Sequence, residues 1–147
     1  MVVDPAKYAE AKLYIDLADT YVGLTAKKSK DIDILRSAIG QNIGFSDEQL
    51  EAGRVAVSGE LKRYNKLKRR FTVGQLIRYT AQNPAVEMAM VVDIPSVADH
   101  GGNARGYYAR ATKSIRVPVI VDGQLVFAHE RHIHKYTKKE LKALGAI

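Results

Sequence analysis

The chain contains no cysteine among its 147 residues. Disulfides, a thiolate nucleophile and sulfur-ligated zinc or iron–sulfur centres are therefore excluded. The first residues, MVVDPAKYAEAK, lack a basic segment followed by an apolar one, so no secretory signal is visible. No apolar run approaches the roughly 20 residues that a membrane helix needs. We therefore expect a soluble protein made in a cytoplasm.

Catalytic signatures are also missing. There is no G-x-S-x-G elbow, and the glycine-containing segment that begins at His100 lacks the Gly-Lys-Ser or Gly-Lys-Thr ending of a phosphate-binding loop. Asp31 and Asp33 lie near a predicted helix start, where the helix dipole explains them. We expect a protein that is not an enzyme and has no cofactor.

Positive charge is concentrated in the later part of the chain. Residues 1–61 carry 7 basic and 10 acidic side chains, whereas residues 62–147 carry 16 and 6, within a formal net charge of +7. This asymmetry favours contact of the later part with a polyanion, either a nucleic acid or an acidic protein surface. Solubility is the other explanation of the excess.

One six-residue pattern occurs three times, as FSDEQL, FTVGQL and YTKKEL. In each copy an aromatic residue precedes Ser or Thr, and Gln or Glu follows three positions later with Leu after it. This is the pattern of a capping box with a hydrophobic staple, so each copy predicts a helix start. The predicted helices begin at Asp47, Val73 and Lys138.

Residues 1–70 are predicted to be a helical region with three helices. Asp4-Pro5 opens the first helix, residues 23–30 form a loop, and a short second helix ends at Gly40. The third helix, over residues 47–70, is basic and amphipathic, and its two glycines permit a kink.

Residues 71–147 are predicted to be an α+β region, so the fold class is α+β, and the two regions together form one compact domain. The helix that starts at Val73 ends near Pro84, and the strand VEMAMVVDI follows. Asp122-Gly123 between two β-rich runs predicts a hairpin. Pro118 predicts that its strand lies at a sheet edge, at least at that position. A short helix ends the chain.

KRYNKLKRR, at the end of the third predicted helix, is the first candidate site, because six of its nine residues are basic and none is acidic. Several cations on one side of a rigid helix suit the phosphates of a nucleic-acid backbone. No base-reading Asn or Gln stands at the start of such a helix, so we expect binding without sequence readout. A solvated surface is the alternative. The candidate residues are Lys62, Arg63, Lys66, Arg69 and Arg70.

The segment from His100 to Arg116 is the second candidate. Its glycines allow close backbone approach, its basic side chains suit phosphates, and its tyrosines suit stacking on bases. A mobile loop whose tyrosines anchor the core, or a loop that grips a neighbouring subunit, are the alternatives. The candidate residues are Arg105, Tyr107, Tyr108, Arg110, Lys113 and Arg116.

HERHIH is a weak pattern for a metal. On a strand, His132 and His134 point to the same side and His129 to the other. Two histidines are an incomplete zinc set, although Asp99 or His100 could fold close to them and supply a further ligand. A pH-sensitive polar surface is the favoured interpretation, and we predict no metal site.

TVGQLIRYTAQNPAVEMAM resembles a helix-to-strand unit found in small, uncharacterised phage-encoded proteins. Residues 72–77 match its Thr-Val-Gly-(Glu or Gln)-Leu-Ile start, and Pro84, Val86 and Glu87 match its turn into the strand. The double Pro that is usual in the family is replaced here by Asn83-Pro84. The resemblance implies a phage origin and carries over no catalytic residue.

Two functional hypotheses follow. The first is a non-enzymatic component of a large assembly, most simply a phage virion protein of the capsid, connector or interior, with a basic face toward nucleic acid or an acidic neighbour. Its partners are other protein subunits, in a homo-oligomer or a hetero-assembly, and it would be cytoplasmic until it enters the virion. The second is a free DNA- or RNA-binding protein without sequence specificity. Neither hypothesis involves a membrane.

Overall fold

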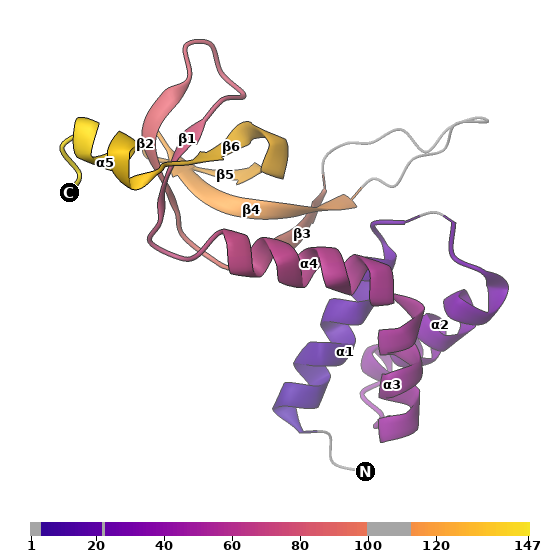
Figure 1. Cartoon of the computed structure of the whole chain (residues 1–147). Helices are drawn as coiled ribbons and strands as arrows, with labels where there is room; N and C mark the ends of the chain where they lie inside the picture. The colour runs from indigo at the N-terminus through magenta and orange to yellow at the C-terminus, as the bar shows by residue number, and fades with distance from the viewer. Residues whose placement is uncertain (1–3, 22, 100–112) are drawn as a thin grey trace. The chain divides into compact units, whose positions relative to one another are not determined.

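The residues described by a computed structural model are 4–21, 23–99 and 113–147. The protein is a mixed α/β protein with an antiparallel, curled sheet (Figure 1). By its internal contacts the chain divides into two units. The helical unit comprises Met1–Asn65 and Val97–Ser114, and the sheet unit comprises Lys66–Ser96 and Ile115–Ile147.

Three helices of the helical unit begin where a side chain caps the first free N–H groups. They are α1 (Pro5–Ala18), α2 (Ala26–Gly40) and α3 (Asp47–Ala56). Asp4 caps the first helix and Ser46 the third, as predicted, and Thr25 caps the second. Because Thr25 caps a helix that begins at Ala26, the predicted loop over residues 23–30 is wrong from Ala26 onward.

The single helix predicted over residues 47–70 is two helices. Val57, with φ −113° and ψ 24°, ends α3, and α4 (Ser58–Arg70) begins one residue later, so the chain changes direction there (Figure 1). Gly53 allows α3 to pack closely against α2, because a Cβ at this position would lie 2.4 Å from Leu35 Cδ1 on α2. The helical half therefore has one helix more than predicted, and the break falls between the two glycines.

The core of the helical unit is formed by the apolar faces of these helices. α1, α2 and α3 contact one another pairwise. Their side chains exclude water from the centre of the unit, which is the main stabilising effect. The buried residues include Ala11, Tyr14, Leu17, Ile32, Leu35, Leu50 and Val57.

The sheet unit contains a meander of antiparallel strands followed by a short helix. Its strands are β1 (Leu76–Tyr79), β2 (Val86–Val91), β4 (Lys113–Val121), β5 (Gln124–Ala128) and β6 (Ile133–Lys135). The strand order is β3-β4-β2-β1-β6, where β3 is Ser96–Asp99, and β5 pairs with β4. Phe71, Ile77, Val91, Val117 and Val119 are buried in the core of this unit.

The helix predicted over residues 73–83 is wrong, because β1 occupies residues 76–79. Gln75 does reach back to the Thr72 N–H, at 3.1 Å, which is half of a capping box. Gly74 then adopts φ +90°, which a helix does not contain, and its N–H donates to Val91 O at 2.8 Å. The chain therefore joins the sheet beside β2 at the point where a helix would start.

The predicted hairpin at Asp122-Gly123 is confirmed. Both residues have positive φ, 50° and 78°, as a two-residue type I′ turn between β4 and β5 requires. The prediction of a sheet edge from Pro118 is wrong for the strand, because β4 lies between β2 and β5. At Pro118 itself the pairing with β2 ends, since the Val92 N–H donates to Pro118 O at 3.0 Å and proline has no N–H to return.

The C-terminal helix is confirmed as α5 (Lys138–Ala143). Thr137 and Glu140 form its capping box, in which each side chain accepts a hydrogen bond from the other's backbone N–H. Gly145, with φ +74°, follows the helix in the left-handed conformation typical of a residue just past a helix end. The strand predicted from VEMAMVVDI is confirmed over Val86–Val91, which is β2, and residues 92–94 lie outside it.

Candidate nucleic-acid interface

Helix α4 has a buried side and an exposed basic side. Tyr64, Leu67 and Phe71, the residue after the helix, recur at helical spacing and are 1–6% exposed. Lys62, Lys66 and Arg69 are spaced by four and three residues on the side of the helix opposite to Tyr64. The apolar residues fix the orientation of the helix, and the three cations therefore form a line in solvent.

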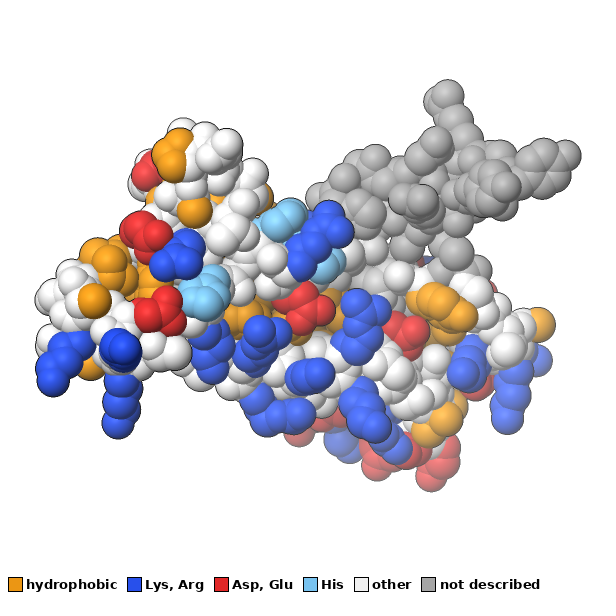
Figure 2. Space-filling view, turned by 45° about the horizontal axis from the view of Figure 1, so that its top comes forward, with side chains coloured by type: hydrophobic (Ala, Val, Ile, Leu, Met, Phe, Trp, Pro, Cys, Tyr) orange, Lys and Arg blue, Asp and Glu red, His pale blue; other side chains and the backbone are white. Residues whose placement is uncertain are grey.

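All six basic residues of α4 are exposed. Figure 2 shows Lys and Arg side chains gathered along this helix. With the described part of the chain, five of the six make no ion pair. We name these five, which are Lys62, Arg63, Lys66, Lys68 and Arg69, the α4 cations.

Arg70 differs from the α4 cations because it has partners within the sheet unit. Its guanidinium lies 3.8 Å from a Glu130 carboxylate oxygen and 5.1 Å from the centre of the Phe71 ring. An Arg that already pairs with a carboxylate and stacks on a ring gains less from a phosphate. Of the five residues predicted from the sequence, Arg70 is the weakest candidate.

Most of the second predicted site lies outside the described residues, namely Arg105, Tyr107, Tyr108 and Arg110. Lys113 is described, and its Nζ lies 3.7 Å from an Asp19 carboxylate oxygen. Arg116 is half-buried in β4 and has an interaction of its own. The two described members of this site are therefore already engaged within the chain.

The histidines do not lie as a strand would place them. Glu130–His132 is a short 3₁₀-helix, and only residues 133–135 form β6. As a result the rings of His129 and His132 lie 6.1 Å apart, and His134 Nε2 lies 3.2 Å from Glu140. The predicted arrangement, with His132 and His134 together and His129 opposite, is wrong.

His129 has a structural role in this segment. Its Nδ1 accepts the Arg131 N–H at 3.1 Å, which caps the 3₁₀-helix. Burial, followed by the charges of Arg116 and Arg131, lowers the pKa of His129 below its ordinary value. Within the described ranges, no three His, Asp or Glu side chains are placed to hold a metal ion.

A hydrogen-bonded group of five side chains in the sheet unit was not predicted from the sequence. We name Arg78, Glu87, His134, Tyr136 and Glu140 the Tyr136 network. The Tyr136 hydroxyl donates to Glu87, and Arg78 Nε donates to the same carboxylate at 2.7 Å. Arg78 and His134 also contact Glu140, at 3.8 and 3.2 Å. The network connects β1, β2, β6 and α5, and no short spacing in the sequence could have indicated it.

Both carboxylates of the Tyr136 network are stabilised in the ionised form. The hydrogen bond from Tyr136, and then that from Arg78, lower the pKa of Glu87. The Thr137 N–H, followed by His134, lowers the pKa of Glu140. Burial, and then Glu87, raise the pKa of Tyr136, which therefore keeps its proton. The network therefore favours ionised Glu87 and Glu140 carboxylates beside a protonated Tyr136 hydroxyl.

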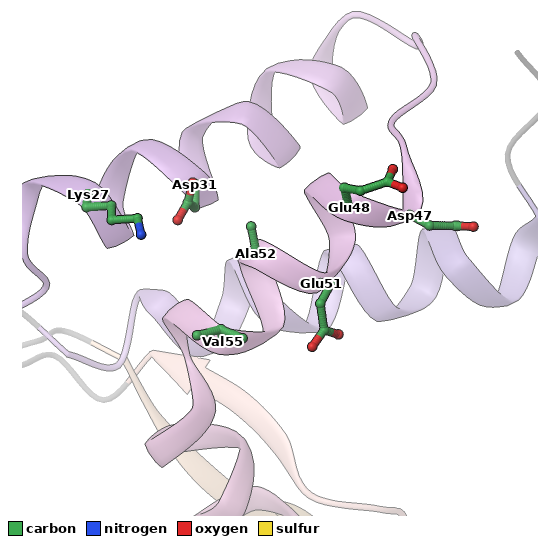
Figure 3. Close-up of a pocket in the computed structure, with 7 residues that line it drawn as sticks. All are labelled: Lys27, Asp31, Asp47, Glu48, Glu51, Ala52 and Val55. Atoms are coloured by element: carbon green, nitrogen blue, oxygen red, sulfur yellow. The ribbon is translucent and has the colours of Figure 1, made fainter.

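A groove between α2 and α3 is lined mainly by acidic side chains (Figure 3). It has a volume of about 550 Å³, and Ala52 and the exposed Val55 form its apolar part. The prediction that the helix dipole explains Asp31 and Asp33 is wrong, because α2 starts at Ala26, well before both residues. The lining residues are Lys27, Asp31, Asp47, Glu48, Glu51, Ala52 and Val55. Two of the acids have partners, since Asp47 pairs with Lys7 and Glu51 with Arg54.

Comparison of the chain with protein-family models, with curated proteins and with solved structures gives no match. Across the described ranges, no helix has the length and apolar character needed to cross a membrane. Among the described residues, the α4 cations are the strongest indication of function.

Proposed function

We propose that the protein is a non-enzymatic component of a multi-subunit particle, and that the basic side of α4 contacts nucleic acid. The observation that carries the proposal is the group of α4 cations, which are exposed and have no ion-pair partner among the described residues. Elsewhere Lys and Arg residues pair with carboxylates, as the half-buried Lys7 and Arg78 and the exposed Arg54 do. Unpaired cations in a line on a rigid helix favour an external polyanion.

The contact is proposed to be with the phosphate backbone and not with bases. Phosphate contacts position a protein on nucleic acid without reading its sequence. α4 presents Lys and Arg on its exposed side, together with one exposed amide, Asn65. A phage particle is the proposed setting. Its support is the sequence resemblance of residues 72–88 to small phage-encoded proteins, although residues 76–79 form a strand here and not the helix of that unit.

The alternative function, a free nucleic-acid-binding protein without sequence specificity, would use the same side of α4. The two functions differ in self-association. A component of a particle forms contacts between copies or with other subunits, whereas a free binder remains a monomer or a small closed oligomer. Light scattering on the purified protein over a range of concentrations shows whether copies bind one another, and growth beyond a small closed oligomer favours the particle component.

The proposed interface is tested by reversing three of its charges. Lys62→Glu, Lys66→Glu and Arg69→Glu together should weaken binding to random-sequence duplex and single-stranded DNA by about a hundredfold or more at 50 mM salt. The measurement is fluorescence anisotropy with labelled oligonucleotides.

The matched control is the triple variant Lys27→Glu, Lys28→Glu and Lys30→Glu, because these lysines are exposed on α2 and the change in net charge is the same. Lys27 and Lys28 lie in the first turn of α2, where acidic side chains suit the helix dipole, and Lys30 is exposed, so the control should fold. Its binding should stay close to the wild type. Equal weakening in both variants would mean that only net charge matters, and would contradict an interface on α4.

A further inference from the structure

Strand β5 is an open edge of the sheet that lacks the features by which proteins usually protect such edges. It pairs with β4 and, within the described part of the chain, with no other strand. Its sequence, QLVFA, contains neither a charged residue nor proline. The opposite edge, β6, has only three residues and includes Lys135. Short length and charge discourage pairing with another strand, and β5 has neither.

The backbone of β5 presents two donors and two acceptors at this edge. The two-residue turn makes Val121 and Gln124 a hydrogen-bonded pair, and hydrogen-bonded and open pairs alternate from there. Leu125 and Phe127 are therefore in open pairs, and their N–H and C=O groups point away from β4. Phe127 stands opposite Pro118, which has no N–H, in agreement with this alternation. Neither residue makes another backbone hydrogen bond with the described residues.

The side chains beside this edge form an exposed apolar surface. The register places Leu76, Met90, Ile120 and Leu125 in one row across β1, β2, β4 and β5, on one side of the sheet. Met90 is 42% exposed, Leu125 54% and Phe127 46%. The row therefore extends to the open edge, where its last side chain, Leu125, is about half exposed to solvent. Exposed apolar surfaces of this kind mark sites of protein–protein contact.

We propose that β5 pairs in antiparallel orientation with β5 of a second copy of this chain. With Val126 at the two-fold axis, Leu125 of each copy lies opposite Phe127 of the other. Each such pair exchanges two N–H···O=C bonds, so both copies use all four of the groups that point outward. The apolar row of one sheet then continues into that of its partner. This pairing closes as a dimer. It rests on the assembly function proposed above, in which it supplies one of the contacts between copies and further contacts build the particle.

The second copy is the occupant that the strand fits best. Around Val126 the open groups and the exposed side chains are arranged symmetrically, which is the requirement for a strand to pair with itself. The absence of charge in QLVFA means that no like charges meet on the new pair. A strand of another protein could pair with β5 without the symmetry around Val126 and without an uncharged sequence, so both properties favour a second copy of this chain.

The test measures self-association and the exchange of two amide protons. In the wild type, the molar mass from light scattering should rise with concentration, and exchange at the Leu125 and Phe127 amides should slow in parallel. The double variant Leu125→Lys and Phe127→Lys should weaken the association at least about tenfold, because it places cations on a strand edge and removes apolar contact.

Two further variants make the result specific. Ile43→Lys with Val73→Lys replaces apolar residues of similar exposure, 55% and 60%, and should associate like the wild type. Phe127→Pro removes a backbone N–H that points outward and leaves the pairing with β4 intact, so it should fold and fail to associate. This variant keeps the test valid if the two lysines disturb folding.

Three results would overturn the proposal. If the lysine and proline variants associate like the wild type, another surface makes the contact, and the assembly function stands. If the wild type associates while the Leu125 and Phe127 amides exchange rapidly, the pairing is likewise wrong. If the wild type is monomeric at all concentrations, the homo-oligomeric form of the assembly function fails as well. DNA binding through α4, measured separately, is independent of all three.

Discussion

At the scale of single residues, the Tyr136 network is the arrangement with the clearest consequence for pH. Tyr136 and Glu87 are 49 residues apart in the sequence, and their hydrogen bond joins the segment before α5 to β2. Arg78 binds the same carboxylate from β1. A carboxylate that accepts two hydrogen bonds, one of them from a cation, is stabilised in its ionised form.

The Tyr136 network should lose part of its stabilising effect in acid. Because the pKa of Glu87 is lower in the folded protein than its ordinary value of 4.5, the ionised carboxylate contributes stability above that pH. The contribution is lost as the pH falls through the lowered pKa. Glu87→Gln cannot ionise, so its melting temperature should fall less between about pH 5 and pH 3 than that of the wild type.

The control for this prediction is Glu48→Gln, since Glu48 is exposed and makes no ion pair with the described residues. Its melting temperature should follow the wild type over the whole range. The measurement is thermal unfolding by circular dichroism at intervals from pH 3 to pH 7. A wild type and a Glu87→Gln variant with parallel curves would show that the Tyr136 network does not hold the carboxylate ionised.

At the scale of elements, one six-residue pattern gives two different structures. In α3 and α5 both hydrogen bonds of the capping box form, through Ser46 with Gln49 and through Thr137 with Glu140. At Thr72 only the hydrogen bond from its N–H to Gln75 forms, and the chain enters β1. Gly74 allows the turn, and pairing with β2 and β6 stabilises the strand.

This difference predicts unequal effects of the same kind of substitution. Ser46→Ala should lower the free energy of unfolding by about 1 kcal/mol, because the Ser46 hydroxyl accepts the Gln49 N–H at 3.1 Å. Thr72→Ala should change it by less than about 0.5 kcal/mol, since the Thr72 hydroxyl makes no hydrogen bond with the described residues. Urea unfolding measures both. A Thr72→Ala variant as destabilised as Ser46→Ala would indicate a third helix cap.

The sequence predicted those elements that depend on neighbouring residues. Helix caps at Asp4, Ser46 and Thr137, the turn at Asp122-Gly123 and the basic side of α4 are all determined within a few positions. β1 and the Tyr136 network depend on which strands pair, and pairing joins residues that are distant in the chain. No local pattern specifies that partner, so a helix was predicted where a strand forms.

At the scale of the whole molecule, the positive charge is concentrated on one helix, α4. The excess of basic residues begins at Lys62, and six of the 16 in the later part of the chain lie within α4. Acidic side chains line the groove between α2 and α3 instead. A net charge of +7 alone favours loose attraction to any polyanion, whereas a line of cations on one helix favours contact at that helix.

The measurement that tests this claim most directly is the salt dependence of DNA binding, in the wild type and in the variant with Lys62, Lys66 and Arg69 changed to Gln. Each phosphate contact contributes about −0.9 to the slope of log K against log salt concentration on duplex DNA. We predict a slope of about −3 or steeper for the wild type. In the variant the slope should be less negative by about 2.7, because three phosphate contacts are lost. A slope that the three substitutions leave unchanged would contradict the account, because the phosphates would then be bound elsewhere.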